Sequence, residues 1–388
     1  MKIIFPRFET IKFHDIFDGG NKYIEHLSEK LVQKGVEVEI VCPRPEGLKK
    51  KFEIVNGVKY VFLKPIWKEQ RLIRLNMFYK LIFSYHLSKY LEKNKFDILH
   101  NTEMFGYFYT FKKRKQPIIT QGWGLEPFYG PESLAQRGLK KIYVKMFLQK
   151  TWLRCLKKSE KVASEEEFQN ELIQKLGIER KQIFALPPAL DLDKIKLYEK
   201  TKKDQRQKLG IGKEDLFVLN VNQLAPDKRV QDIIKATSIL KENNKIKLVI
   251  VGKGPSEEEL KKMIKNQGIV NEVQMLKDLD EKELYNLYFS ADIFVSASNQ
   301  HDWIMSIQEA MACGLPIVSS GQPFLVKENI NGFVVGIGKP EKIAKAIGNI
   351  WNGKKMKKMG IESKKLSQKY DWKNIADKSI KEYKKLLK

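Results

Sequence analysis

The strongest constraint in this sequence is a regular alternation of short apolar, β-branched runs with longer segments that repeat apolar residues at helical spacing. The alternation runs through about the first 190 residues, stops, and begins again near residue 216. Continuous apolar strands separated by helices are typical of parallel sheets covered on both faces. The pattern therefore predicts an α/β protein with two Rossmann-like domains. The expected strands are 2–5, 37–42, 59–63, 97–100, 117–121, 182–186, 216–221, 246–251, 273–276, 293–296, 316–319 and 333–335.

The chain has 388 residues, more than one domain usually holds. The two series of strands are separated by residues 194–213, which are charged and lack large apolar periodicity, so we expect domains at 1–195 and 205–370. Residues 372–388 read as a further amphipathic helix. Two such sheets facing each other across a cleft would place ligands outside the carboxyl ends of their strands. The loops after these strand ends are therefore the candidate sites.

Positive charge is concentrated in two parts of the chain. The sequence contains 72 Lys and Arg against 47 Asp and Glu, a net charge of +25. Residues 51–158 carry 22 basic against 7 acidic residues, and residues 351–388 carry 13 against 4. Segments 67–74 and 137–158 combine basic and aromatic side chains; the second has an apolar side with lysines between. It fits a core helix with a solvated basic face, or a surface for anionic lipid or an acidic acceptor.

Several classes of protein are excluded by residues that the sequence lacks. Its three cysteines are far apart, which argues against a disulfide framework or a cysteine zinc site and favours a reducing compartment. Its five histidines show no i, i+4 pair, and no apolar run reaches membrane-spanning length. No signal-peptide core is visible, so we expect a cytoplasmic protein. No nucleic-acid-binding module is recognisable, and basicity alone does not indicate one.

Two loops could hold a phosphate. Gly19 and Gly20 open a helix, where backbone amides and the helix dipole favour an anion, although an ordinary helix start fits as well. Lys228 lies between a strand and the start of a helix, where a cation is unfavourable unless an anion is nearby. We read Gly252-Lys253-Gly254-Pro255 as a structural turn, because it lacks the glycines of a dinucleotide or P-loop motif.

Residues 299–314 form the segment richest in functional side chains. A helix is expected to begin near Ile304, which places Glu309 more than one turn inside it, beside Ala310, Ala312 and Gly314. A buried carboxylate there could accept the two hydroxyls of a ribose; a surface glutamate is the alternative. Two acidic pairs, 191/193 and 278/280, resemble metal ligands, but Asp280 is better explained as a helix N-cap.

At these residues the chain resembles a family-4 glycosyltransferase of the GT-B fold over essentially its whole length. The most specific motif is Glu309-Ala310-Met311-Ala312-Cys313-Gly314-x-Pro316. The other motifs are Gly19-Gly20, Phe96 to His100, Gln223-x4-Lys228, Gly252-x-Gly254-Pro255 and Ala291 to Val295.

The resemblance implies a hexosyltransferase-type enzyme (EC 2.4) that moves a sugar from a nucleotide-sugar with retention of configuration, without a metal or another cofactor. Its donor is a UDP-sugar or, as the second choice, a GDP-sugar. The first domain would bind the acceptor, a lipid-linked or cell-envelope glycan, and helix 371–388 would cross back to it. The two basic regions would then lie on one side, at the inner face of the cell membrane. Lys228 and Glu309 would be the catalytic pair. The donor-binding residues would be Gly19, Gly20, Gln223, Lys228, His301, Met305, Ser306 and Glu309, and the acceptor-side candidates Trp123 and Glu126.

The chain departs from the family pattern around the donor. The arginine usual beside the phosphate lysine is Gln223, and the glutamate usual eight residues before Glu309 is His301. Where the family usually has two glycines in that loop, this sequence has Asp302 and Ile304. Where the family usually has a histidine after strand 117–121, this sequence has Trp123. These changes motivate an alternative: a catalytically silent GT-B scaffold or partner subunit that binds no nucleotide.

Overall fold

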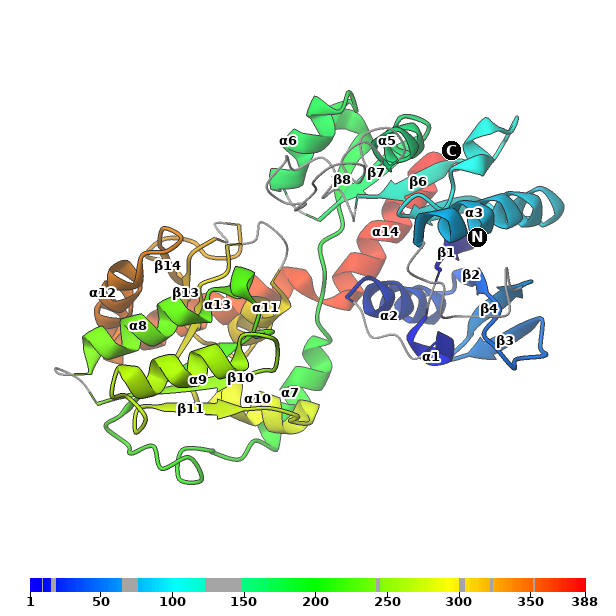
Figure 1. The fold of residues 1–388 in the computed structure, drawn as a ribbon. Coiled ribbons are helices and arrows are strands. Elements are labelled where there is room, and N and C mark those ends of the chain that lie inside the picture. Colours follow the sequence, from blue (N-terminus) through cyan, green and yellow to red (C-terminus); the bar gives the residue numbers. More distant parts are fainter. Residues whose placement is uncertain are drawn as a thin grey trace, which may run out of the picture. The chain divides into compact units, whose positions relative to one another are not determined.

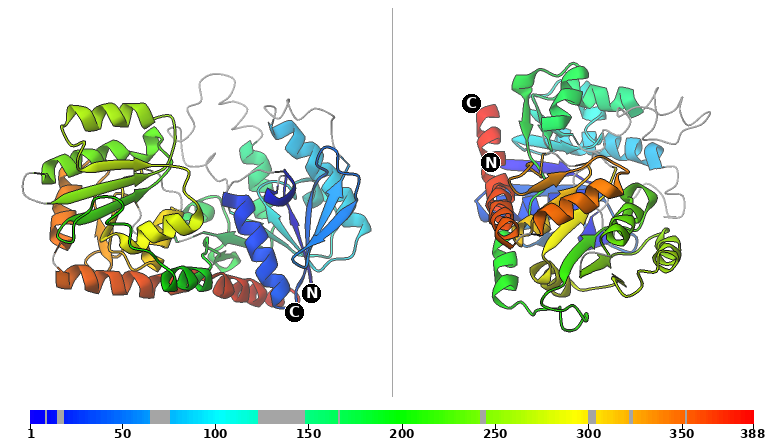
Figure 2. Two further views of the ribbon diagram at one scale, coloured as in Figure 1. Left: turned by 90° about the horizontal axis from the view of Figure 1, so that it is seen from below. Right: turned by 90° about the vertical axis from the view of Figure 1, so that its left-hand side faces the viewer.

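The protein forms two compact α/β units (Figure 1). The computed structural model describes residues 1–8, 10–14, 19–64, 76–122, 148–165, 167–241, 245–299, 304–321, 324–351 and 353–388. Unit 1 comprises Met1–Ala189 together with Trp372–Lys388, and unit 2 comprises Leu190–Asp371. Each unit has a sheet of its own, with helices against both faces (Figure 2).

Unit 1 contains an eight-stranded sheet in the order β3-β4-β2-β1-β5-β6-β7-β8, parallel except for the β3–β4 hairpin. Its strands are β1 (Lys2–Pro6), β2 (Glu37–Pro43), β3 (Phe52–Val55), β4 (Val58–Leu63), β5 (Ile98–Thr102), β6 (Ile118–Gln121), β7 (Lys161–Ser164) and β8 (Ile183–Ala185). Its helices are α1 (Ile11–His14), α2 (Gly19–Gln33), α3 (Asn76–Lys93), η2 (Phe108–Phe111), α5 (Gln149–Lys157), α6 (Glu167–Lys175), η5 (Arg180–Gln182) and α14 (Trp372–Leu386).

Successive side chains of the unit 1 strands enter two separate cores, as the pleat requires. In β1, Ile3 and Phe5 pack with α2 and α14, whereas Ile4 packs with α3 on the opposite face. On α14, Trp372 lies edge-on to Tyr23 of α2, with ring centroids 4.9 Å apart. The C-terminal helix is therefore an integral part of the unit 1 core.

Unit 2 contains a six-stranded parallel sheet in the order β11-β10-β9-β12-β13-β14. Its strands are β9 (Leu216–Val221), β10 (Ile246–Val251), β11 (Val273–Leu276), β12 (Ile293–Ser296), β13 (Ile317–Ser319) and β14 (Gly332–Val334). Its helices are α7 (Leu192–Lys200), η6 (Pro226–Lys228), α8 (Val230–Leu240), α9 (Glu257–Asn266), α10 (Glu281–Ser290), α11 (Met305–Ala312), α12 (Pro340–Ile350), α13 (Gly353–Ser367) and η7 (Gln368–Tyr370). Leu216 and Val218 face α8 and α12, and Phe217 and Leu219 face α10 and α11.

Every strand expected from the apolar pattern is present, and two further strands were missed. β3 is an edge strand with two exposed side chains, so its sequence lacks a buried run; β7 has only four residues and follows α5 closely. The expected division within residues 194–213 is wrong. The chain passes from unit 1 to unit 2 between Ala189 and Leu190, because Leu192 and Ile195 of α7 are buried in the core of unit 2.

Candidate functional site

The order of the strands in unit 2 places a switch point between β9 and β12. From β9 the chain proceeds through β10 to β11 on one side, and β12 then returns to the other side of β9. Helix α8, which follows β9, packs on one face of the sheet, and α11, which follows β12, packs on the other. In open α/β sheets, ligands bind at such a switch point. The loops after these two strands are residues 222–229 and 297–304.

Lys228 stands in the first of these loops, at the end of the short helix η6. Its ammonium lies 3.3 Å from Asp227 Oδ2, and its side chain is 17% exposed. Arg229 follows in a left-handed conformation with φ 50°, and its Nε donates to Asp232 Oδ2 at 2.7 Å. The left-handed residue ends η6 and starts α8, so Lys228 is held at the junction and remains partly accessible.

The second loop is joined to the first by a main-chain hydrogen bond. The Asn299 N–H donates to the Asp227 carbonyl oxygen at 2.9 Å. Below this bond, the Asn220 amide of β9 donates to the Val295 carbonyl of β12 at 2.8 Å. The loop that carries Lys228 and the loop that leads into α11 thus meet at the switch point. His301 and Asp302 lie outside the described residues.

The glycines after β10 are required by close backbone packing. A Cβ atom on Gly252 would lie 1.8 Å from the Asn222 carbonyl oxygen, and one on Gly254 would lie 2.4 Å from that of Leu224. The Ser256 N–H donates to the same Leu224 oxygen at 2.9 Å. This turn therefore supports the 222–229 loop, which agrees with its structural interpretation.

Glu309 projects from α11, which begins at Met305 as expected. Its carboxylate is half-buried and accepts a hydrogen bond from the Tyr288 hydroxyl, 2.9 Å from Glu309 Oε2. Tyr288 is fully buried on α10 and also donates to the Ser306 carbonyl at 3.4 Å. Burial, with the nearby Glu309 charge, raises the pKa of Tyr288 well above its usual value, so Tyr288 stays a donor. Sequence reasoning missed Tyr288, because nothing in the α10 pattern shows that it faces α11.

The small residues after Glu309 serve helix packing. Ala310 and Ala312 are buried, and a Cβ on Gly360 of α13 would lie 2.2 Å from the Gly314 carbonyl oxygen. The sequence suggested close approach of a ligand or a strand at this point. The element that approaches is instead helix α13.

The remaining candidate residues are spread over both units. In unit 2, Gln223 is exposed, and Met305 and Ser306 form the partly exposed first turn of α11. In unit 1, Gly19 and Gly20 are the first residues of α2, so they open a helix as expected. Trp123 and Glu126 lie outside the described residues.

Unit 1 has its own switch point, between β1 and β5, and an arginine lies there that the sequence did not single out. Arg7 follows β1 and is 5% exposed; its Nε donates to Asn21 Oδ1 of α2 at 2.8 Å. Its guanidinium is 3.8 Å from Glu103, which follows β5. Arg7 lies outside any motif, so only the fold reveals that it sits near the start of α2.

Both acidic pairs have helix-capping roles. Asp191 Oδ1 accepts from the Lys194 N–H and caps α7, and Asp280 forms a capping box with Glu283 at the start of α10. The N-cap expected at Asp280 is confirmed. Asp278 pairs with Lys253 at 2.8 Å. Within the described part of the chain, no group of three or more His, Cys, Asp or Glu side chains is arranged to hold a metal ion.

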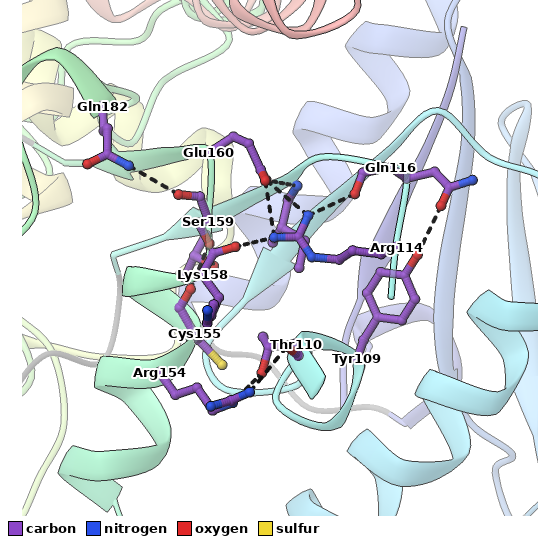
Figure 3. A network of polar contacts seen from close by, with 12 residues as sticks. Tyr109, Thr110, Arg114, Gln116, Arg154, Cys155, Lys158, Ser159, Glu160 and Gln182 are labelled. Carbon is purple, nitrogen blue, oxygen red and sulfur yellow. Dashed lines mark hydrogen bonds and ion pairs between the residues drawn. The ribbon is translucent and has the colours of Figure 1, made fainter. Parts of the chain in front are cut away.

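Arg114 and Arg154, two basic residues of unit 1, make polar contacts with other residues of the protein (Figure 3). The Arg154 guanidinium lies over the Phe111 ring, 3.4 Å from its centroid, and Arg154 Nε donates to Thr110 Oγ1 at 2.8 Å. Arg114 donates to the carbonyls of Gln116 and Lys158 and pairs with Glu160. Trp152, in the basic segment 137–158, is 3% exposed and packs in the core. The described half of segment 137–158 therefore contains a core helix, α5, and the Trp152 side chain is buried in that core.

No helix within the described residues is long and apolar enough to cross a membrane.

Comparison with known proteins assigns the chain to a family. Residues 17–194 match the model described as Glycosyltransferase Family 4, and residues 201–366 match the model described as Glycosyl transferases group 1. The chain belongs to the family-4 glycosyltransferases. Among curated relatives of this glycosyltransferase is the alpha-monoglucosyldiacylglycerol synthase of Streptococcus pneumoniae. It is 30% identical over 155 residues, 39% of this chain and 34% of the relative. The chain spans about a third to a half of the length of the curated relatives it matches.

Solved structures show that this family-4 chain has the GT-B fold. The sucrose-phosphate synthase of Thermosynechococcus elongatus superimposes with a TM-score of 0.76 at 17% identity, covering 99% of this chain and 98% of that one. Anabaena Alr3699/HepE in complex with UDP gives 0.72 at 16% identity, covering 99% and 100%. The expected architecture of two Rossmann-like domains is thereby confirmed.

Proposed function

We propose that the chain transfers a sugar, with retention of configuration, from a nucleotide-sugar to a lipid-linked or cell-envelope glycan acceptor. The observation that carries the proposal is the junction of the Lys228 loop with the loop into α11 at the switch point of unit 2. A UDP-sugar is the favoured donor, since Alr3699/HepE is described in complex with UDP-glucose at the same fold. A lipid acceptor is favoured by the name of the pneumococcal relative.

The residues have separate roles in this reaction. Lys228, beside the amides of the 222–229 loop, stabilises the negative charge that develops on the departing diphosphate. Glu309, oriented by Tyr288, accepts hydrogen bonds from the ribose hydroxyls and fixes the nucleotide. No described side chain at this junction is an activated nucleophile, so catalysis rests on orienting donor and acceptor and on leaving-group stabilisation. Gly19 and Gly20, at the start of α2, are proposed to contact the donor diphosphate.

A screen of nucleotide-sugar hydrolysis by mass spectrometry tests the proposal without knowledge of the acceptor. We expect one UDP- or GDP-sugar to be consumed, and consumption to persist in EDTA, because Lys228 and helix N-termini can supply the positive charge that a metal otherwise would. Loss in EDTA with recovery in manganese or magnesium would contradict metal independence. Failure to consume any donor and to bind UDP or GDP would favour the silent scaffold.

Substituting Glu309 with Gln should weaken UDP or GDP binding by about 1 kcal/mol, the difference between charged and neutral hydrogen bonds. The helix should persist, since both residues suit it. The effect should be much smaller for a nucleotide without ribose hydroxyls, measured by calorimetry. Equal losses for both nucleotides would show that Glu309 supports α11 and does not contact the ribose.

We also propose that unit 1 adsorbs to anionic membranes at the inner face of the cell membrane. Phe52 and Ile54 of edge strand β3 are 54% and 62% exposed and follow three exposed lysines at 49–51. Exposed apolar side chains beside lysines suit an anionic lipid surface, at about 1 kcal/mol per basic residue.

Co-sedimentation with vesicles should occur with anionic lipid, be absent with neutral lipid, and fade between 0.1 and 1 M salt as the Debye length falls from about 10 to about 3 Å. Lys140, Lys141 and Lys145 belong to the basic segment 137–158 and lie outside the described residues. Changing them to Glu should reduce adsorption and leave nucleotide binding unchanged, because Lys228 and Glu309 belong to the other unit. Adsorption that does not depend on the charge of the lipid would contradict the proposal.

A further inference from the structure

Three polar side chains from distant parts of unit 1 form a buried chain of hydrogen bonds. Tyr383 Oη of α14 lies 2.7 Å from His100 Nδ1 of β5, and His100 Nε2 lies 3.2 Å from Gln121 Oε1 at the end of β6. All three residues are fully buried. The Phe5 ring covers the imidazole, with centroids 4.7 Å apart. The chain of bonds joins the C-terminal helix to the carboxyl edge of the sheet.

The protonation states determine which group donates and which accepts in each of these hydrogen bonds. Burial lowers the pKa of His100 to about 4, so its imidazole is neutral near pH 7, and burial raises the pKa of Tyr383, so its hydroxyl is protonated. The oxygen of Gln121 can only accept, so His100 Nε2 carries the proton. His100 Nδ1 must then accept from the Tyr383 hydroxyl. With the amide oxygen taken by His100, the NH2 group of Gln121 is turned away from it.

That NH2 group is one of two buried side-chain donors without a partner among the described residues at this edge, the other being Arg44 Nε just after β2. Gln121 Nε2 is buried and has no hydrogen-bond partner among the described residues. Neighbouring strands end in satisfied groups: Thr102 of β5 donates to the Pro6 carbonyl, and Ser164 of β7 donates to Asn170 Oδ1 at 2.7 Å. A buried donor without a partner loses its hydrogen bonds to water with no compensation, so native proteins seldom keep one without a role.

We propose that the Gln121 amide donates to an oxygen of a substrate, a hydroxyl or a phosphate, at the carboxyl edge of the unit 1 sheet. Tyr383 and His100 are positioning residues that keep its NH2 group turned toward the substrate. Gln121 is the last residue of β6, at the edge where parallel sheets bind ligands. The C-terminal helix therefore contributes to substrate binding through Tyr383. The catalytic part of this inference rests on the proposed sugar transfer.

The donor and acceptor in each of these hydrogen bonds can be measured in the protein without a substrate. In protein labelled with ¹⁵N-histidine, His100 should show the neutral tautomer with the proton on Nε2 at pH 7, with the signal assigned by its loss in His100→Gln. Tyr383→Phe removes the donor to Nδ1, and a second tautomer should appear. Tyr23→Phe is the matched control, since Tyr23 is a buried tyrosine beside α14 whose hydroxyl bonds the Leu186 carbonyl. A proton on Nδ1 in the wild type would overturn the proposal.

The role of Gln121 requires kinetics with the donor and acceptor identified for the wild type. Gln121→Met should lower kcat/KM about tenfold, because it removes the amide donor. It also removes the oxygen that accepts from His100 Nε2, so a loss of stability should accompany the kinetic effect, and the rates are compared at a temperature where both proteins are folded. Tyr383→Phe should lower kcat/KM about threefold to tenfold, and Tyr23→Phe should leave it unchanged. A raised KM for only one substrate identifies the molecule that supplies the oxygen. Unchanged kcat/KM in Gln121→Met overturns this inference alone, whereas a wild type that transfers no sugar overturns the proposed function with it.

Discussion

Lowering the pH from 7 to 4 should remove about 3 kcal/mol of stability through His100 alone. Its pKa falls from an ordinary value of 6.5 to about 4 in the folded protein because the imidazole is completely buried. Between these values the unfolded chain binds a proton that the folded chain excludes. The free energy of unfolding therefore decreases as the pH falls from 6.5 to 4, by about 1.4 kcal/mol for each unit of pKa difference.

Denaturant unfolding at a series of pH values checks this, with wild type compared with His100→Gln. The difference between the two proteins cancels the groups they share. We expect the advantage of the wild type to shrink by about 3 kcal/mol from pH 7 to pH 4. A difference that stays constant with pH would show that His100 titrates normally in the folded protein.

Replacing Lys228 with Ala should weaken nucleotide binding by about 1.5–3 kcal/mol, roughly a 10- to 150-fold rise in Kd, with the fold intact. The substitution removes a cationic hydrogen-bond donor from the proposed diphosphate site. It also leaves Asp227 without the ammonium that now lies 3.3 Å away, and this carboxylate would then repel the phosphates. Calorimetric titration with UDP and GDP measures the change.

Lys253→Ala is the matched control for Lys228. Lys253 stands in the adjacent loop after β10, but its side chain is 73% exposed and paired with Asp278. Its removal should change nucleotide affinity little, because an exposed ion pair contributes only about 0–1 kcal/mol. Equal losses for both lysines would indicate general attraction by surface charge, and an unchanged affinity in Lys228→Ala would refute the diphosphate assignment.

The sheets were predictable because their strands are buried on both faces. A strand such as β9 is then apolar at every position except Asn220, and such a run is visible without knowledge of its neighbours. β3 was missed for the opposite reason, since Phe52 and Ile54 face solvent at an edge. The motif around Glu309 was equally visible, because a helix start, a carboxylate and small residues follow one another directly in the chain.

The sequence by itself therefore determined the fold class, the family, the start of α11 and the candidate roles of Lys228 and Glu309, all of which depend on residues close together in the chain. Only the tertiary structure decided which partners these residues have. Tyr288 and Glu309 are 21 residues apart, and His100 and Tyr383 are 283 apart. No local pattern encodes such pairs, because they arise when helices pack onto a sheet and bring distant side chains together. Burial likewise assigned Trp152 to the core and left the Gln121 amide without a protein partner.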